Sequence, residues 1–230
     1  MTKVPDRYLE ERRAEILEAA KRVFVRKGYG SATVQDIASE ADVAAGSIYR
    51  YYPGKADLIG AVAESSAYDD HVLFSGFDEE TPPPSPLAAL LVSGEGVRRS
   101  LHEAAGIDLC VLRMESGLAS YRDDEVSERV RPHIRETRAM LERALTDAQA
   151  AGELDASVDP KDAAGLIHAF VAGSSTLRVA LGEEFDVDGP WKLMSRLFAT
   201  LFTPEFAAHL ASLEPSTGTE RGAGHQPDAD

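Results

Sequence analysis

Apolar side chains recur at intervals of three and four residues along most of the chain, and this spacing predicts amphipathic helices. The first, at residues 6–28, carries one stripe of Ile16, Ala20, Val23 and Phe24. The same periodicity predicts helices at 55–73, 87–104, 107–119, 123–150, 160–181 and 190–213. No segment alternates apolar and polar residues as a half-buried strand would. The chain is therefore expected to be all-α, with about nine helices once the two short ones described next are counted.

Two short helices joined by a tight turn are predicted between Thr33 and Tyr52. Thr33 and Asp36 form a capping-box-like pair that starts the first of them. Asp42 interrupts the apolar rhythm, and aspartate tolerates the left-handed backbone of a turn. The second helix, at 46–52, directs Ile48 and Tyr52 inward and leaves polar and aromatic side chains outside. Residues 6–54 are thus predicted to form a three-helix domain with a helix-turn-helix, whose second helix suits the DNA major groove.

Residues 9–65 resemble the N-terminal domain of the TetR family of ligand-responsive transcriptional regulators. The motif residues found at the matching spacing are Thr33, Ile37-Ala38, Val43, Gly46-Ser47-Ile48-Tyr49, Tyr51-Tyr52, Pro53, Lys55 and Leu58. Two departures stand out: Asp42 occupies a position where glycine is usual, and Ala44-Ala45 replace a Ser/Thr and a polar or basic residue. Ala44 has no side-chain acceptor to cap a helix, a loss of roughly 1 kcal/mol. The resemblance implies a DNA-binding regulator with a helical ligand domain.

The predicted DNA contacts fall into two groups. By the resemblance and their chemistry, Thr33, Tyr51 and Lys55 are expected to hold phosphates and so to fix the register on DNA. Gln and Arg can pair bidentately with adenine and guanine, and the candidates for base edges are Gln35, Ser47, Tyr49 and Arg50. Ala45 is placed to touch a thymine methyl, beside Gly46 on the same helix. For Tyr49 and Tyr51, the alternative is that their rings pack within the domain.

Residues 55–214 are expected to form a helical domain that binds a ligand and dimerises. The proline-rich stretch 81–86 is expected to be an extended break, and the tail 215–230 lacks aliphatic anchors and is expected to be disordered. A pocket among the helices at 87–177 would combine apolar walls with a few polar groups, which suits a mainly apolar small molecule. The polar candidates are His102, Arg113, Tyr121 and His168, and for each the alternative is an ordinary place on the helix surface or in the core. The acidic composition raises a cationic ligand as another alternative, although carboxylates mostly form a solvated surface.

A seam of small residues along the helix at 160–181 would allow another helix to approach closely. The seam consists of Ala169, Gly173, Thr176 and Ala180, and the apolar helix at 190–213 adds Trp191 and Phe198. By the resemblance alone, these last two long helices pack against their mates in a second copy as a four-helix bundle. A homodimer is therefore expected, with its interface on these six residues.

The net charge of −15 is unevenly distributed. Residues 1–60 carry ten Lys/Arg and nine Asp/Glu, whereas residues 61–230 carry fourteen and thirty. Nonspecific affinity for DNA comes mainly from neutralisation of phosphates by basic side chains. An acidic body beside a near-neutral head therefore fits sequence-specific binding through few contacts better than nonspecific coating of DNA.

No pattern typical of an enzyme or a metal protein is present in the sequence. The di-iron motif Glu-x-x-His is absent, and Glu205 and His209 form a single pair without a further ligand. Cys110 is the only cysteine, which excludes an intramolecular disulfide and a cysteine-rich metal site. No cofactor and no metal are expected. The apolar runs are shorter than about 20 residues and the N-terminus is charged, so a cytoplasmic protein without a membrane segment is expected.

The sequence thus predicts a transcriptional regulator, a repressor that binds a palindromic operator as a homodimer and is released by a small-molecule effector. It is not expected to be an enzyme. The alternative is a helical small-molecule-binding protein or enzyme whose head has lost DNA binding, which the acidic balance and Ala44-Ala45 suggest. Binding to the DNA upstream of its own gene would discriminate between the two.

Overall fold

The fold is described by a computed structural model covering residues 6–75 and 85–213. Its helices are α1 (Asp6–Lys27), α2 (Val34–Glu40), α3 (Ala45–Ile48), α4 (Lys55–Ser75), α5 (Pro86–Ser100), α6 (Ala104–Arg122), α7 (Asp124–Ala150), α8 (Pro160–Leu181), the 3-10 turn η1 (Gly182–Glu184), α9 (Asp188–Ala199) and α10 (Pro204–Leu213). The described residues form no strand, so the predicted all-α class is confirmed. Most of the predicted break at 81–86 and the whole of the tail at 215–230 lie outside them.

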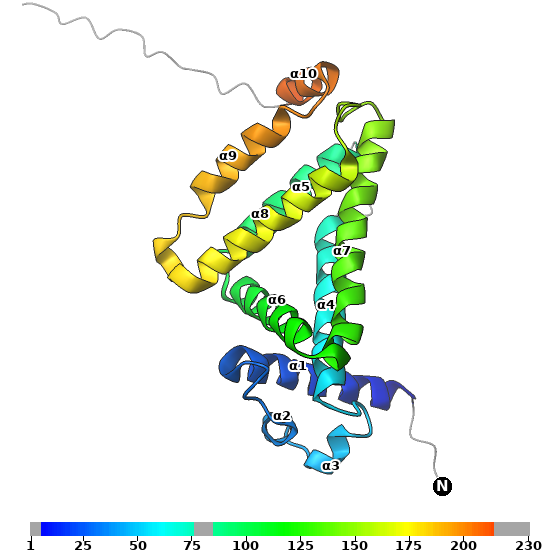
Figure 1. The fold of residues 1–230 in the computed structure, drawn as a ribbon, viewed down its shortest axis with the longest axis vertical. Coiled ribbons are helices and arrows are strands. Elements are labelled where there is room, and N and C mark those ends of the chain that lie inside the picture. Colours follow the sequence, from blue (N-terminus) through cyan, green and yellow to red (C-terminus); the bar gives the residue numbers. More distant parts are fainter. Residues whose placement is uncertain (1–5, 76–84, 214–230) are drawn as a thin grey trace, which may run out of the picture.

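The helices form a small head and a larger body (Figure 1). Helices α1, α2 and α3 make the head, and α4 begins there and runs into the body beside α7. Helices α6, α7 and α8 form the sides of a triangle, with α4 and α5 behind it. Helix α9 leans away from α8 and leads to α10 at the far end from the head. The body thus extends from the head to α10, and the head lies at one end of it.

One hydrophobic core joins the head to the body. In the head it contains Phe24, Ile37 and Ile48, all fully buried. The same cluster continues through Leu58, Ile59 and Val62 of α4 to Leu112 of α6 and to Val126 and Val130 of α7. A second cluster fills the opposite end of the body, between α5, α7, α8 and the phenylalanines of α9 and α10. Because α4, α6 and α7 bury side chains with the head, their positions and that of the head are coupled.

Two predicted helices are shorter than expected. The recognition helix was predicted over 46–52, but α3 ends at Ile48, and Arg50 and Tyr51 donate to carbonyls three residues back in tighter turns. The last helix, predicted over 190–213, is divided into α9 and α10. Pro204 keeps the preceding residue out of the helical region, and Thr203 donates its N–H to the carbonyl of Glu153 and its hydroxyl to that of Gly152. These contacts fix the break against the α7–α8 turn. Pro132, which was expected to kink the seventh helix or mark its start, lies inside an unbroken α7.

Among the described residues, one helical segment, residues 160–184, is long and apolar enough to cross a membrane by length and composition alone. Its most apolar stretch has a mean hydropathy of 1.3 and is only 22% buried. This is weak evidence for a membrane, because helices in bundles of soluble proteins meet the same criterion. The exposed side of α8 carries the small residues predicted for a contact with another helix, namely Ala169, Gly173, Thr176 and Ala180.

Candidate nucleic-acid interface and effector cavity

The first helix of the motif begins with the predicted capping box. Thr33 Oγ1 accepts the N–H of Asp36 at 3.1 Å, and Asp36 Oδ2 accepts the N–H of Thr33 at 3.0 Å. Lys27 Nζ donates to Asp36 Oδ1 at 2.7 Å. The hydrogen bonds from Lys27 and from Thr33 lower the pKa of Asp36 to about 2. The start of α2 is therefore tied to the end of α1, which sets the angle at which the motif leaves the first helix.

The turn between α2 and α3 has the predicted geometry. Asp42 has a φ of 52°, the left-handed conformation in which glycine is usual, and Val43 donates its N–H to Ala38 O at 3.0 Å. Ala44 precedes α3 and makes no side-chain cap bond. Ile48 and Tyr52 are buried, and the hydroxyl of Tyr52 donates to the carbonyl of Arg13 at 3.2 Å. The short α3 is thus held by its buried side rather than by a cap.

The outward side of the motif presents most of the predicted DNA contacts. Gln35, Gly46, Tyr49 and Arg50 are exposed, and Tyr49 is 55% exposed, so its ring does not pack within the head. Thr33 is exposed as well, whereas Ala45, Ser47 and Tyr51 are half-buried. Ser47, Arg50 and Tyr51 line a hollow together with Tyr8 and Arg12 of α1. The sequence did not indicate that Arg12 lies in this hollow, because its position on the first helix gave no sign that the start of α1 lies beside α3.

Lys55 has an internal role that the sequence did not reveal. Its Nζ donates to the carbonyls of Tyr29 at 2.8 Å and Ala32 at 3.0 Å and lies 4.3 Å from the centre of the Tyr29 ring. Burial lowers the pKa of this lysine. The ammonium therefore joins the start of α4 to the loop between α1 and α2. Its predicted phosphate contact stays a prediction.

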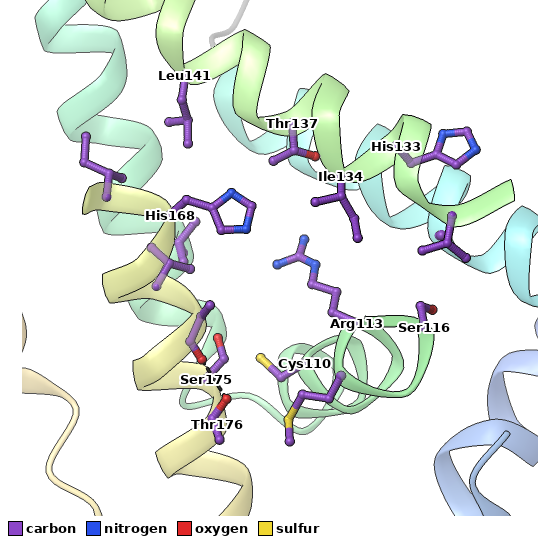
Figure 2. Close-up of a pocket in the computed structure, with 17 residues that line it drawn as sticks. Cys110, Arg113, Ser116, His133, Ile134, Thr137, Leu141, His168, Ser175 and Thr176 are labelled. Atoms are coloured by element: carbon purple, nitrogen blue, oxygen red, sulfur yellow. Dashed lines mark hydrogen bonds between the residues drawn. The ribbon is translucent and has the colours of Figure 1, made fainter. Parts of the chain in front are cut away.

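The body contains a cavity of about 280 Å³ between α4, α5, α6, α7 and α8. Its lining residues are Ala63, Val97, Cys110, Arg113, Met114, Ser116, Val130, His133, Ile134, Thr137, Leu141, Ile167, His168, Val171, Ala172, Ser175 and Thr176. Figure 2 shows the Arg113 guanidinium in the middle of the space and the His168 ring facing it from α8. Arg113, Thr137 and His168 also interact with other groups of the protein. The wall is mainly apolar, with a few polar side chains that could orient an occupant.

Two of the four predicted pocket residues lie in this cavity and two do not. Arg113 and His168 line it, 55 positions apart in the chain. His102 is exposed beyond the end of α5, where its Nε2 lies 3.2 Å from Asp188 Oδ1. Tyr121 is 85% exposed near the end of α6. The expectation that His102 and Tyr121 line this pocket is corrected: His102 lies in the turn between α5 and α6, and the rotation of α6 directs Tyr121 outward.

Helix α6 connects the cavity to the head through a residue not assigned from the sequence. Glu115 Oε2 accepts the backbone N–H of Tyr29 at 2.7 Å, across 86 positions of the chain. Gly28 precedes Tyr29 with a φ of 74°, and a Cβ at Gly28 would lie 3.2 Å from Glu115 Oε1. The glycine therefore both ends α1 and leaves room for the carboxylate. Nothing in the sequence indicated that a carboxylate on α6 would contact the main chain of the head.

The residues predicted for the dimer face differ in their exposure on the protomer. Ala169, Gly173, Thr176 and Ala180 are all exposed on one side of α8, and Thr176 also reaches the cavity. Leucines about half exposed also occur on both helices, namely Leu166, Leu177 and Leu181 on α8 and Leu193 and Leu197 on α9. Trp191 instead packs on Phe170, with ring centres 5.2 Å apart, and the buried Phe198 packs on Phe202 at 5.6 Å. Both rings face the interior of the protomer, so Phe198 is a core residue and its place in the predicted interface is corrected. Among the described residues, no group of three or more His, Cys, Asp or Glu side chains is arranged to hold a metal.

A helix-turn-helix head joined to an all-helical body with a cavity among its helices defines a class of DNA-binding regulators. The family model described as bacterial regulatory proteins of the tetR family matches residues 16–62. The model for the tetracyclin repressor-like C-terminal domain matches residues 118–188. The chain belongs to the TetR family of transcriptional regulators.

Several characterised relatives extend over most of the chain. It is 27% identical to the HTH-type transcriptional regulator TtgR of Pseudomonas putida over 187 residues, which are 78% of this chain and 86% of the relative. It is 26% identical to the DNA-binding transcriptional repressor TetR of Mycobacteroides abscessus over 201 residues, 85% and 96% of the two chains. The relatives are named as regulators rather than enzymes, which supports a DNA-binding regulator here.

Solved structures show the same fold. A TetR-family transcriptional regulator from Rhodococcus sp. superposes with a TM-score of 0.72 at 19% identity, covering 84% of this chain and all of that one. The complex of SmeT with triclosan gives a TM-score of 0.71 at 22% identity, covering 86% and 94%. These likenesses extend beyond the head, so the arrangement of the body is also that of the family.

Proposed function

We propose that this protein is a repressor that binds a palindromic operator as a homodimer and releases it when a small molecule occupies the body. The observation that carries the proposal is the link between the two parts: the helix that supplies Arg113, Met114 and Ser116 to the cavity also holds the head through Glu115. An occupant that changes the position of α6 would therefore change the position of the head. A ligand shifts such an equilibrium only if it binds one arrangement more tightly than the other.

On DNA, the exposed Gln35, Tyr49 and Arg50, with Ser47, are the proposed base contacts. Ala45 is proposed to meet a thymine methyl beside Gly46, and Thr33 and Tyr51 are proposed to hold phosphates. Lys55 is also proposed to hold a phosphate. Its ammonium fixes the loop before Thr33 as well, through the carbonyls of Tyr29 and Ala32. Few basic side chains are involved, so base readout rather than phosphate neutralisation would provide most of the selectivity.

The proposed dimer uses the exposed side of α8 with α9. The small residues allow the backbones to approach closely, and the half-exposed leucines supply the apolar area. Fully burying a leucine is worth roughly 1.5–3 kcal/mol, so these five half-exposed side chains would contribute roughly 4–8 kcal/mol per subunit. A two-fold dimer would place its two recognition helices on half-sites about 34–36 Å apart, or a multiple of this.

The proposed effector is a mainly apolar small molecule with one or two polar groups. The cavity is about 280 Å³, roughly twice the ~150 Å³ cavity that binds benzene in a well-studied case. An occupant of about two fused rings would fit that space. Arg113 and His168 are the proposed groups that orient it. In their own complexes, SmeT holds triclosan and FadR of Bacillus subtilis holds stearoyl-CoA, and we propose a ligand for this chain by that analogy of fold.

Selection of DNA by the purified protein tests the proposal. The ligand-free protein is mixed with fragments of its own genome, and retained fragments are examined by mobility shift for a palindrome shared among them. Compounds that raise the melting temperature in a screen are then tested for release of the retained fragment. A folded dimer that retains no fragment would overturn the DNA-binding function, and hits that never release DNA would overturn the effector switch.

A further inference from the structure

The contact between Glu115 and Tyr29 lies where the cavity and the head meet. We propose that Glu115 is the positioning residue through which occupancy of the cavity changes the placement of the DNA-reading motif; this rests on the proposed function. The carboxylate accepts a main-chain N–H of the head at 2.7 Å, and both groups are partly buried. A hydrogen bond from a main-chain group to a carboxylate is directional, so a small displacement of the helix that carries it weakens it.

On the head side, Tyr29 is the centre of a small cluster. Its ring packs against Phe24 at 5.6 Å, and Lys55 Nζ lies above the same ring while bonding to the carbonyls of Tyr29 and Ala32. Thr33, the cap of α2, follows Ala32 directly. The N–H that Glu115 holds therefore belongs to the short segment that sets where α2 begins. Displacing this segment moves the first helix of the motif and, with it, the turn to α3.

On the cavity side, Arg113, Met114 and Ser116 line the space, and Glu115 lies among them on the same helix. Successive helical side chains are about 100° apart around the axis. A helix is also stiff along its length, so pressure from an occupant on the cavity side of α6 moves the whole turn that includes Glu115. Cys110, one to two turns earlier, faces the cavity as well.

The other connections between body and head are more rigid. Arg129 of α7 bonds to Asp57 of α4 at 2.8 Å, and a Cβ at Gly60 of α4 would lie 2.9 Å from Arg129 Cβ. Helices α4 and α7 are therefore closely packed where α4 leaves the head. Helix α6 contacts the head through Leu112 and Ala119 in the shared core and through the hydrogen bond of Glu115 beside Gly28. Of these contacts, the directional hydrogen bond is the one that a small movement of α6 can break without a clash.

The only cysteine allows the cavity to be filled without knowing the effector. The Cys110 thiolate adds to one carbon of the carbon–carbon double bond of N-ethylmaleimide, and the neighbouring carbon takes up a proton from water. The product is a thioether in the cavity. Operator affinity, on DNA selected as above, and hydrogen exchange of the Tyr29 amide are measured with and without the adduct. The proteins compared are the unmodified chain, Glu115→Ala, the conservative Glu115→Gln, and Cys110→Ser as the control that the reagent cannot label at this position.

In the unmodified chain the adduct should lower operator affinity at least tenfold and speed exchange of the Tyr29 amide by a similar factor. In Glu115→Ala that amide should exchange quickly already, and the adduct should change operator affinity less than twofold. Glu115→Gln keeps a carbonyl acceptor and should respond partly. A purely structural role would instead lower stability while leaving the response to the adduct unchanged.

An equal loss of operator affinity in the unmodified chain and in Glu115→Ala would overturn the inference, as would an adduct that leaves the Tyr29 amide unaffected. The adduct could speed exchange of the Tyr29 amide only when Glu115 is present, while the protein binds no DNA fragment at all. In that case the proposed function fails and the coupling stands. Should Cys110 prove unreactive in the folded protein, Val171→Phe places a ring in the same cavity from α8 and carries the same comparison.

Discussion

The exposed side of α8 offers a quantitative prediction about the dimer. Leu177 is 45% exposed in the protomer, and the proposed interface would bury this remainder. Complete burial of leucine is worth roughly 1.5–3 kcal/mol, so Leu177→Ala removes roughly 0.5–1 kcal/mol per subunit once the alanine methyl is counted. A two-fold interface uses the same residue from each copy. The dimer should therefore lose roughly 1–2 kcal/mol, and its dissociation constant should rise about 5- to 30-fold.

Helix α6 supplies a matched control. Leu118 is also 45% exposed but lies on α6, away from the proposed face. Sedimentation equilibrium of the unmodified chain, Leu177→Ala and Leu118→Ala measures all three dissociation constants under one set of conditions. Only Leu177→Ala should weaken association, and it should weaken operator binding at concentrations near the dissociation constant. Equal constants for the two variants, or a monomeric unmodified chain at micromolar concentration, would refute the assignment of this face.

Three further predictions concern single side chains. Arg50→Ala should relax the preference at one base pair per half-site by roughly 1–3 kcal/mol in binding assays on operator variants, and uniform weakening on all sequences would show a phosphate contact instead. Glu153, buried between the helices, accepts the N–H of Leu87 at 2.8 Å, so Glu153→Ala should cost roughly 1.5–3 kcal/mol and lower the melting temperature by about 3–12 °C; a smaller drop than for an exposed control site would contradict this. The pKa of Asp36 is about 2 in the fold and 3.8 as its ordinary value, so its contribution to stability is complete above pH 3.8 and is lost as the pH falls through 2. Asp36→Asn should flatten the acid limb of stability measured by urea unfolding, and an unchanged slope would count against the bonds from Lys27 and Thr33.

The sequence by itself determined the local structure of the head. Thr33 and Asp36 are three residues apart, so the capping box depends only on local geometry and was predicted correctly. The left-handed Asp42 and the missing cap at Ala44 were also correct, because turn and cap preferences reside in the individual residue. Helical periodicity located the long helices for the same reason. The division of the last helix was missed because the bonds that fix the break come from Gly152 and Glu153, about fifty positions away.

Only the tertiary structure decided which side chains meet. Arg113 and His168 share a cavity whereas His102 and Tyr121 face outward. Nothing in composition distinguishes these pairs, because the rotation of each helix and the course of the turn that carries His102 are set by neighbouring elements. Phe198 looks like an interface residue in the sequence but packs on Phe202 within the protomer. The Glu115 contact with Tyr29 joins residues 86 positions apart. Periodicity shows that a helix has an apolar side, but the partner of that side is chosen by packing among all the helices at once.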